Sequence, residues 1–551
     1  MRVRPKRRWL ALASAATLAA AVAPLAGAQP GSAAPAPAPA SAKMHLDCAK
    51  SSLCTEVADS EEVFGEGVYV GHDEPAATFY DNRQGAGNNS TYLLRLPKDP
   101  PTLPKQDGTG GTFNFQLHPA FWLGMALCDN QSAPEFTHAP CTPDSDVNIF
   151  NGSDPKAADY IGKHPGTAFL EVQFYPPGWV PFFNAVSCDS TKWCAAMAIF
   201  SLSQDQNHGI LNNADCLGTV GVEPANFAFI TRNGHPHAPP SPLAATVETF
   251  TPNPATDLFM NSGDQLAVSI HDSHDGLRVD MADLSAGKFG SMTASVANQF
   301  AQINFEPNAT TCSQSPYAFR PMYGSSSENT RVPWAAHTYN VSFSDEIGHF
   351  EYCDAVAAEG GVCTKPGGAD RGNPPDGDDR GCFSGATSLR VNVGGCIATE
   401  NDFDGTAYQK DWPGSTTPGQ DRLLHPEAIE FTSPVFNGFH HYARSGFEAD
   451  LPRIESADTL DPKFPPCNRS TGDNCVNPPP GANFYPIYTT RNGPVGCKWQ
   501  LGGTNIPGTT NTFGGSSTTE YGPLLRSVYP SATGPVIRIN NFRRILDHNP
   551  C

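Results

Sequence analysis

The strongest regularity in this sequence is an alternation of apolar and polar residues with a period of two. Residues 265–271 read QLAVSIH and residues 276–283 read GLRVDMAD, and in each run every second side chain is apolar. Successive side chains of a β-strand point to opposite faces, so this period is typical of strands with one buried face. The joining segment 272–276, DSHDG, contains the residues that favour turns. The pattern therefore predicts an antiparallel hairpin over residues 265–283.

The same alternation recurs along the chain, with clusters of Pro, Gly, Asn and Asp between the runs. The 51 Gly and 52 Pro divide the sequence into short elements and argue against long helices. We predict an all-β fold of antiparallel β-sandwich or jelly-roll type, built as two units and crosslinked by disulfides. Further strands are expected within residues 227–231, 300–305, 337–344, 389–393, 428–433 and 536–540.

The sixteen cysteines indicate a disulfide-rich protein. All of them follow residue 28, their number is even, and none forms a C-x-x-C pair, so up to eight disulfides are expected rather than a zinc ribbon or a thioredoxin-like centre. The last residue, Cys551, predicts that the C-terminus is held by a bridge. Spacing alone favours three short-range bridges: Cys48–Cys54, Cys188–Cys194 and Cys467–Cys475.

The N-terminal segment predicts export. Residues 1–28 combine a basic start, an apolar Ala-rich run and the small-residue site Ala26-Gly27-Ala28, as in a secretory signal peptide. Residues 29–43 contain PAPAPA and resemble an extended Pro/Ala linker. No other stretch has the length and hydropathy of a membrane span. We therefore expect a secreted, extracellular protein without membrane insertion.

The remaining chain is expected to form two β-rich units. The polar segment KPGGADRGNPPDGDDRG at 365–381 has no apolar period, so residues 361–385 are predicted to be a linker or a long loop. This places a β-sandwich at 44–360 and a C-terminal β-rich domain at 386–551. The segment RNGHPHAPPSP at 232–242 is a further break within the first unit.

Charge limits the class of partner. The chain has 35 Lys and Arg against 55 Asp and Glu, a net charge of −20. A strongly acidic surface repels nucleic acids and anionic membranes. We therefore expect no nucleic-acid partner, and a neutral polysaccharide or glycan fits better than a polyanion.

The segment AFLEVQFYPPGW at 168–179 is the first candidate site. In an extended chain Phe169, Glu171, Gln173 and Tyr175 lie on one side. Aromatic rings stack on sugars, while acids and amides bind hydroxyls, as a saccharide cleft requires. Glu171 is a candidate catalytic carboxylate, with a second carboxylate expected about 5–10 Å away. Gln173, Tyr175 and Trp179 are candidate substrate-binding residues. The alternative is a polar face that is simply solvated or packed between sheets.

A second group of titratable residues lies in SDEIGHFEYC at 344–353. Glu346, His349 and Glu351 follow a predicted strand closely enough to form an acid/base pair, and they are candidate catalytic residues. The alternative is a turn at the end of the strand, in which the acids cap main-chain amides.

A structural calcium site is predicted at ENDFDG, residues 400–405. Glu400, Asp402 and Asp404 place oxygen donors at alternate positions before a Gly, as a calcium loop requires. The twelfth position is Asp411 instead of Glu, and an Asp/Gly turn is the alternative. HDSHDG at 271–276 also has metal-binding residue types, but Asp and Gly are expected in a hairpin turn on turn grounds alone, and the turn is the preferred interpretation. No other cofactor is expected.

Three stretches carry a resemblance to other proteins. EEVFGEGVYVGHDEP (61–75), FQLHPAFWLGMALCD (115–129) and SDEIGHFEYC (344–353) resemble large secreted proteins of actinobacteria and fungi whose function is uncharacterised. The resemblance covers most of the mature chain and agrees with export, and it implies no particular activity, ligand or catalytic residue.

Three functional hypotheses follow from these features. The first is a secreted carbohydrate-active protein, either a glycosidase-like hydrolase or a polysaccharide-binding protein acting on a neutral glycan. The second is an acid-active peptidase in which Glu171 and Gln173 activate water. The third is a non-catalytic, disulfide-rich extracellular structural or surface protein. Whether the chain is an enzyme is left open, because a β-sandwich supports all three functions.

Overall fold

In a computed structural model the chain consists of two units, residues 1–43 and 44–551, and every described residue belongs to the second. The described residues are 76–80, 90–96, 121–132, 134, 166–175, 191–205, 209–321, 341–344, 353–356, 363–366, 427–431, 433, 435–436, 440–450, 488–493, 496–501, 506–509, 527–529, 536–538, 541–546 and 548–551.

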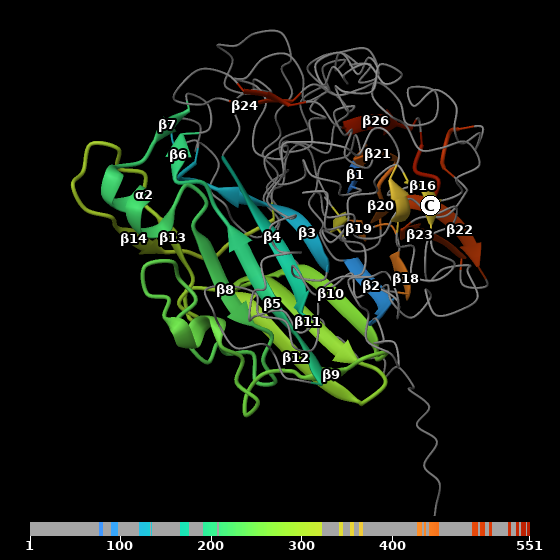
Figure 1. The fold of residues 1–551 in the computed structure, drawn as a ribbon, viewed down its shortest axis with the longest axis horizontal. Coiled ribbons are helices and arrows are strands. Elements are labelled where there is room, and N and C mark those ends of the chain that lie inside the picture. The colour runs from blue at the N-terminus through green and yellow to red at the C-terminus, as the bar shows by residue number, and fades with distance from the viewer. Residues whose placement is uncertain are drawn as a thin grey trace, which may run out of the picture. The chain divides into compact units, whose positions relative to one another are not determined.

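Most of the strand residues belong to two large antiparallel sheets (Figure 1). The first sheet has nine strands among the described residues. Its order is β26 (Asn541–Ile545), β21 (Arg444–Asp450), β1 (Ala76–Tyr80), β15 (Val341–Ser344), β3 (Phe121–Asp129), β4 (Gly166–Tyr175), β5 (Lys192–Phe200) and β8 (Ala225–Phe229), with β9 (Met260–Asn261) beside β5.

The second sheet has seven strands among the described residues. Its order is β12 (Lys288–Ala294), β11 (Gly276–Asp283), β10 (Gln265–Ser273), β2 (Ser90–Arg95), β18 (Glu427–Phe431), β23 (Gly496–Leu501) and β22 (Tyr488–Gly493).

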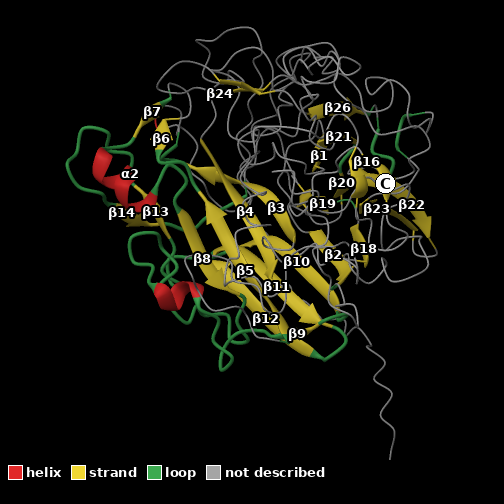
Figure 2. Cartoon of the chain, viewed as in Figure 1, coloured by secondary structure: helices red, strands yellow, loops and turns green. Residues whose placement is uncertain are grey.

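Smaller elements lie outside these sheets. The part of the chain that is described contains one α-helix, α2 (Ala214–Val220), whose first turn is capped by the Asn213 side chain, and one named 3-10 helix, η4 (Val247–Phe250) (Figure 2). The prediction of an all-β fold is therefore confirmed. The paired short strands are β6 (Gln204–Asp205) with β7 (Ile210–Leu211), β13 (Ala301–Ile303) with β14 (Gln314–Pro316), β16 (Cys353–Val356) with β17 (Cys363–Pro366), β19 (Val435–Phe436) with β20 (His440–His441), and β24 (Ser527–Tyr529) with β25 (Val536–Arg538).

The predicted hairpin over residues 265–283 is confirmed. β10 pairs with β11 from Leu266 opposite Asp283 to Ser273 opposite Gly276. Buried and partly exposed side chains alternate along both strands, as expected for strands with one face in the core. Gly276 has φ +145°, and a Cβ atom there would lie 2.3 Å from the carbonyl oxygen of Ala294, so the turn requires glycine.

The two sheets share one hydrophobic core. Leu170 and Val172 on the first sheet belong to the same buried cluster as Val268 and Val279 on the second. At Gly290 the second sheet comes so close to the first layer that an added Cβ would lie 2.9 Å from the Ile230 side chain. The sheets therefore pack as a β-sandwich, and each sheet also has an outer face.

The expected division into two β-rich domains does not match the strand pairing. β21 and β26 flank β1 in the first sheet, and β18 joins β2 to β23 in the second. Strands from 427–545 are thus built into the same sheets as strands from 76–95, because long-range pairing decides which segments share a core. The segment 361–385 does not separate independent sheets. The break near 232–242 also lies within continuous structure that follows β8.

Disulfides connect distant parts of the described chain. Cys216 bonds to Cys312, and Cys497 bonds to Cys551, so the predicted bridge at the last residue is confirmed. The three short-range bridges each include a cysteine outside the described residues. Within the described chain, no helix has the length and apolar character needed to cross a membrane.

Candidate functional site

Strand β4 occupies an interior position of the first sheet, between β3 and β5. Nine residue pairs join it to β3 and seven join it to β5. Its sequence GTAFLEVQFY is rich in aromatic and β-branched residues, which suit a strand. Leu170, Val172 and Phe174 point into the sandwich core and are fully buried. The opposite side of the strand therefore belongs to the outer face of the first sheet.

On that outer face Glu171, Gln173 and Tyr175 form a chain of hydrogen bonds. The Tyr175 hydroxyl donates to Oε1 of Gln173, and Nε2 of Gln173 donates to Oε2 of Glu171 at 2.5 Å. The tyrosine thus orients the amide, whose NH₂ group faces the carboxylate. We name these three residues the β4 polar chain.

The strand register places small residues on both sides of Glu171. Gly124 on β3 and Ala198 on β5 are its direct partners, whereas Gln173 lies between Trp122 and Ala196. Side chains directly opposite one another lie on the same face of an antiparallel sheet. Trp122 packs edge-on against Phe169, with ring centroids 5.3 Å apart. Large aromatic rings therefore surround the β4 polar chain, and the smallest side chains lie beside its carboxylate.

The outer face is less open than the sequence pattern suggested. Gln173 is 2% exposed and Tyr175 is fully buried, whereas Glu171 is half-buried. A saccharide cleft requires this polar side to open to water, and the structure does not meet that requirement at Gln173 and Tyr175. Part of the reason for the burial of Tyr175 is Phe227 of β8, on the same sheet face, whose ring centroid lies 6.3 Å from that of Tyr175. In this structure the two buried residues are placed to orient Glu171 rather than to contact a polymer.

The other predicted site residues lie outside the described residues. This applies to the catalytic candidates Glu346, His349 and Glu351, to Trp179, and to the calcium ligands Glu400, Asp402 and Asp404. Among the described residues, no group of three or more His, Cys, Asp or Glu side chains could hold a metal ion. The calcium site stays a prediction.

The motif HDSHDG forms the turn of the β10–β11 hairpin. His271 contacts Asp280 at 3.0 Å across the hairpin, and His274 is almost fully exposed beside Asp275. The two histidines have different partners, and the turn interpretation accounts for both.

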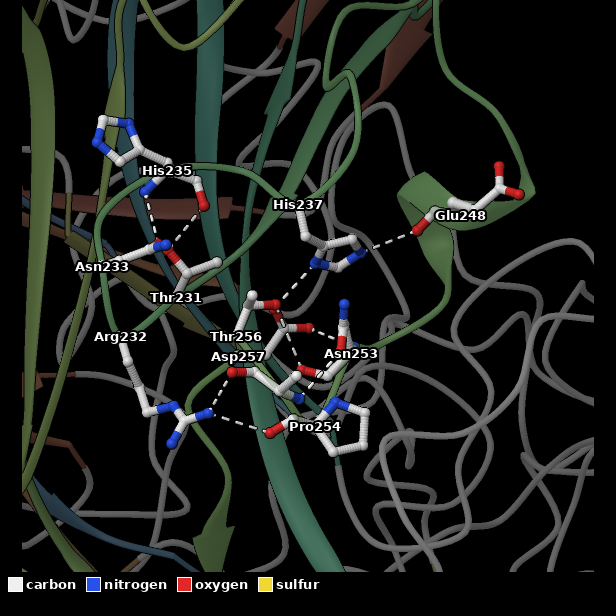
Figure 3. A network of polar contacts seen from close by, with 11 residues as sticks. Thr231, Arg232, Asn233, His235, His237, Glu248, Asn253, Pro254, Thr256 and Asp257 are labelled. Atoms are coloured by element: carbon white, nitrogen blue, oxygen red, sulfur yellow. Dashed lines mark hydrogen bonds and ion pairs between the residues drawn. The ribbon is translucent and has the colours of Figure 1, made fainter.

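A histidine–aspartate pair that the sequence analysis did not identify lies in the segment after β8 (Figure 3). Nδ1 of His237 contacts Oδ1 of Asp257 at 2.8 Å, and Nε2 contacts the main-chain oxygen of Glu248 at 2.9 Å. The His237 ring also stacks on Phe229, with centroids 5.7 Å apart. The only signal in the sequence is a histidine in a Pro-rich loop, twenty residues before an aspartate.

No family model, curated protein or solved structure matches this chain. The functional interpretation therefore depends on the geometry of its own residues.

The contacts of His237 suit a protonated ring. A carbonyl oxygen only accepts, and Asp257 accepts also from Thr256 at 2.9 Å and from the main-chain nitrogen of Asn253 at 2.7 Å. Burial lowers the pKa of His237, but the hydrogen bond and charge of Asp257, together with main-chain carbonyls, outweigh this effect, so the pKa is raised. With both ring nitrogens engaged, His237 is not positioned as a general base. The pair instead anchors η4 to the loop that carries Asp257.

Asp129 is a second buried titratable group missed by the sequence analysis. It lies at the end of β3 and is fully buried, and Gln302 of β13 and the main-chain nitrogen of Gln131 donate to its Oδ1 atom. Burial raises the pKa of Asp129 to about 6, although hydrogen bonds from Gln131 and Ser132 oppose the shift. A single Asp after an apolar strand gives no sequence signal of such burial.

Proposed function

We propose that this protein is a secreted carbohydrate-active protein that acts on a neutral glycan, with Glu171 as the carboxylate that contacts the sugar. The observation that carries the proposal is the hydrogen bond from Gln173 to Glu171, held in turn by Tyr175. This arrangement orients a half-buried carboxylate among aromatic side chains on a sheet face. Such a carboxylate can accept hydrogen bonds from sugar hydroxyls or take part in general acid/base chemistry.

Hydrolysis of a glycosidic bond requires a second carboxylate. β15 ends at Ser344, which pairs with Trp122 beside Gln173. Glu346 follows two residues later in the sequence, and we propose it as the partner of Glu171. The distance between the two carboxyl groups would then determine whether the enzyme retains or inverts the anomeric configuration. Without this partner the site would bind a glycan and not cleave it.

Features outside the site support export. The N-terminal 28 residues have the pattern of a secretory signal, and the described chain contains the disulfides Cys216–Cys312 and Cys497–Cys551. The acidic net charge of −20 favours a neutral partner over a polyanionic one.

The experiment compares wild type with Glu171→Gln on a polysaccharide array and in reducing-sugar release assays. Glu248→Gln is the matched control, because its carboxylate is fully exposed and only its main-chain oxygen contacts His237. For a hydrolase we expect Glu171→Gln to lower turnover by about 100-fold or more while binding persists. For a binding protein we expect weaker retention and no turnover in either form. Unchanged binding and turnover in Glu171→Gln would refute the proposal.

The contact between Glu171 and Gln173 also favours a second candidate, an acid-active peptidase. A Glu/Gln pair can orient and activate water, although the burial of Gln173 argues against its reaching a peptide substrate. Hydrolysis of an unfolded protein at acid pH, lost in both Glu171→Gln and Gln173→Leu, would favour this candidate. If the chain has neither activity, the non-catalytic structural function is the remaining explanation.

A further inference from the structure

The outer face of the second sheet contains several partly or fully exposed side chains. Side chains on this face alternate with buried ones along β2, β10 and β11. The strand register arranges the outward side chains in two rows that cross four strands. The apolar row contains Leu93, Ala267, Ala282 and Phe289, and the polar row contains Thr91, Ser269, Asp280 and Ser291.

The apolar row contains two large hydrophobic side chains that are exposed to solvent. Phe289 on the edge strand β12 is 70% exposed, and Leu93 on β2 is 40% exposed. Small alanines lie between them, so the row forms a shallow apolar surface with an aromatic ring at one end. Neighbouring strands are about 4.8 Å apart, so the row is about 14 Å long. It lies on the side of the sandwich opposite Glu171, because Leu170 and Val268 both face the core between the sheets.

The polar row offers hydroxyl groups without net charge. The hydroxyls of Thr91 and Ser269 are 3.0 Å apart and form a pair across β2 and β10. Asp280 is the one charged member, and Arg278 neutralises it through contacts of 2.7 to 3.0 Å. In a chain with a net charge of −20, the polar row together with Arg278 has no net charge. It therefore suits a partner that is itself uncharged.

We propose that the apolar and polar rows form a second binding surface for a neutral glycan chain. The CH faces of the sugar rings would lie on Phe289 and Leu93, and the sugar hydroxyls would bond to Thr91, Ser269 and Asp280. The surface would hold a polymer while Glu171, on the other sheet, contacts the sugar at the proposed site. The inference rests on the proposed function, since both sites take the same class of ligand.

Affinity gel electrophoresis of the full exported chain tests this surface. The probes are soluble β-glucan, xylan, mannan and starch, with polygalacturonate and heparin as polyanions. Phe289→Ala should weaken retention by the neutral polymer about tenfold, as expected when part of an aromatic side chain is no longer covered. The double variant Thr91→Ala/Ser269→Ala should weaken it severalfold. Val247→Ala is the control, because Val247 is 73% exposed but lies on η4.

Several results would overturn the inference. They are unchanged retention of Phe289→Ala, an equal loss in Val247→Ala, no retention of the wild type by a neutral polymer, or stronger retention by the polyanions. Dissociation of a dimer by Phe289→Ala, with glycan retention unchanged, would instead assign the surface to a second copy of the chain. Glu171→Gln separates this test from that of the proposed function. If it lowers turnover on short soluble oligosaccharides and Phe289→Ala has no effect on polymers, only the second surface is refuted.

Discussion

At the scale of single residues, the β4 polar chain depends on one buried hydroxyl. Tyr175 donates to Oε1 of Gln173, and this contact determines which side of the amide faces Glu171. Both Tyr175 and Gln173 are buried, so if the Tyr175 hydroxyl were removed, water would not readily take its place as the donor to Gln173. The orientation of the candidate carboxylate is therefore coupled to the stability of the strand.

Tyr175→Phe tests this coupling. It leaves the ring in place and removes the donor, so we expect the free energy of unfolding to fall by about 1–3 kcal/mol. Activity or binding that depends on Glu171 should fall as well, because the amide is released. Denaturant unfolding and the glycan assays measure the two effects. A variant as stable and as active as wild type would show that the hydroxyl contact has no role.

Gly276 is a position where the fold leaves no space for a side chain. Its positive φ and the 2.3 Å approach of an added Cβ to Ala294 leave no room for a side chain. We expect Gly276→Ala to lower the free energy of unfolding by about 1–3 kcal/mol. Gly287→Ala is a comparison from the next hairpin, since it also has positive φ but nothing within 4 Å. Equal losses in the two variants would refute the steric explanation and leave only the backbone conformation.

At the scale of elements, His237 connects η4 to the loop of Asp257. The pKa of His237 is raised in the folded protein, so its stabilising effect is fully present below its ordinary pKa of 6.5 and is lost as pH rises through the folded value. We expect the wild type to lose stability above that range relative to His237→Gln, whose side chain does not titrate. Urea unfolding between pH 5 and pH 9 measures the difference. Parallel pH profiles would contradict a charged His237.

Asp129 is expected to act in the same direction as His237, because its pKa is also raised in the folded protein. Its pKa is about 6 in the folded chain and 3.8 in the unfolded reference, so the native state binds a proton first as pH falls. Stability should therefore rise between pH 6 and pH 4 by up to about 3 kcal/mol. Asp129→Asn removes this titration, and its stability should vary less over the same range. An identical pH dependence of stability in wild type and Asp129→Asn over this range would refute the raised pKa of Asp129.

The sequence pattern predicted the elements better than their surroundings. The runs at 265–271 and 276–283 were correctly predicted as a hairpin, because period-two patterning and turn chemistry are local properties. The run at 168–175 has the same period, and it is also a strand. The error concerned the outer face of β4, where Phe227 packs against Tyr175. That contact joins residues 52 positions apart and leaves no local trace in the sequence.

At the scale of the whole molecule, distant parts of the chain are built into the same sheets. β2 lies between β10 and β18, and β1 lies between β15 and β21. Strands from residues 427–545 and strands from residues 76–95 thus pair with one another in both sheets. Neither of these two segments forms a complete sheet without the other. This explains why the Pro/Gly-rich segment 361–385 misled the prediction of domains. A composition typical of a linker indicates only that a segment has few apolar residues to bury. It does not show that the chain before it and the chain after it fold as separate domains.

The bridge Cys497–Cys551 joins the chain end to β23 of the second sheet. It closes a loop with a sequence separation of 54, for which chain-entropy arguments give about 4 kcal/mol of stabilisation. We expect Cys497→Ser/Cys551→Ser to lose up to that amount and to unfold at a lower temperature. Calorimetry of the double variant, with and without reductant, measures the loss. No change in the melting temperature would show that the bridge does not restrain the unfolded chain.

The sequence by itself determined the class of the fold, the β10–β11 hairpin and the bridge at the last residue. Each depends on local pattern, turn chemistry or cysteine content. Tertiary structure decided which polar faces remain open, because exposure depends on what packs from distant positions. Thr91 and Gln173 each lie between two buried residues of a strand, yet Thr91 is exposed and Gln173 is buried. A strand's period determines that two faces differ, and only the packing of the remaining chain determines which of them meets water.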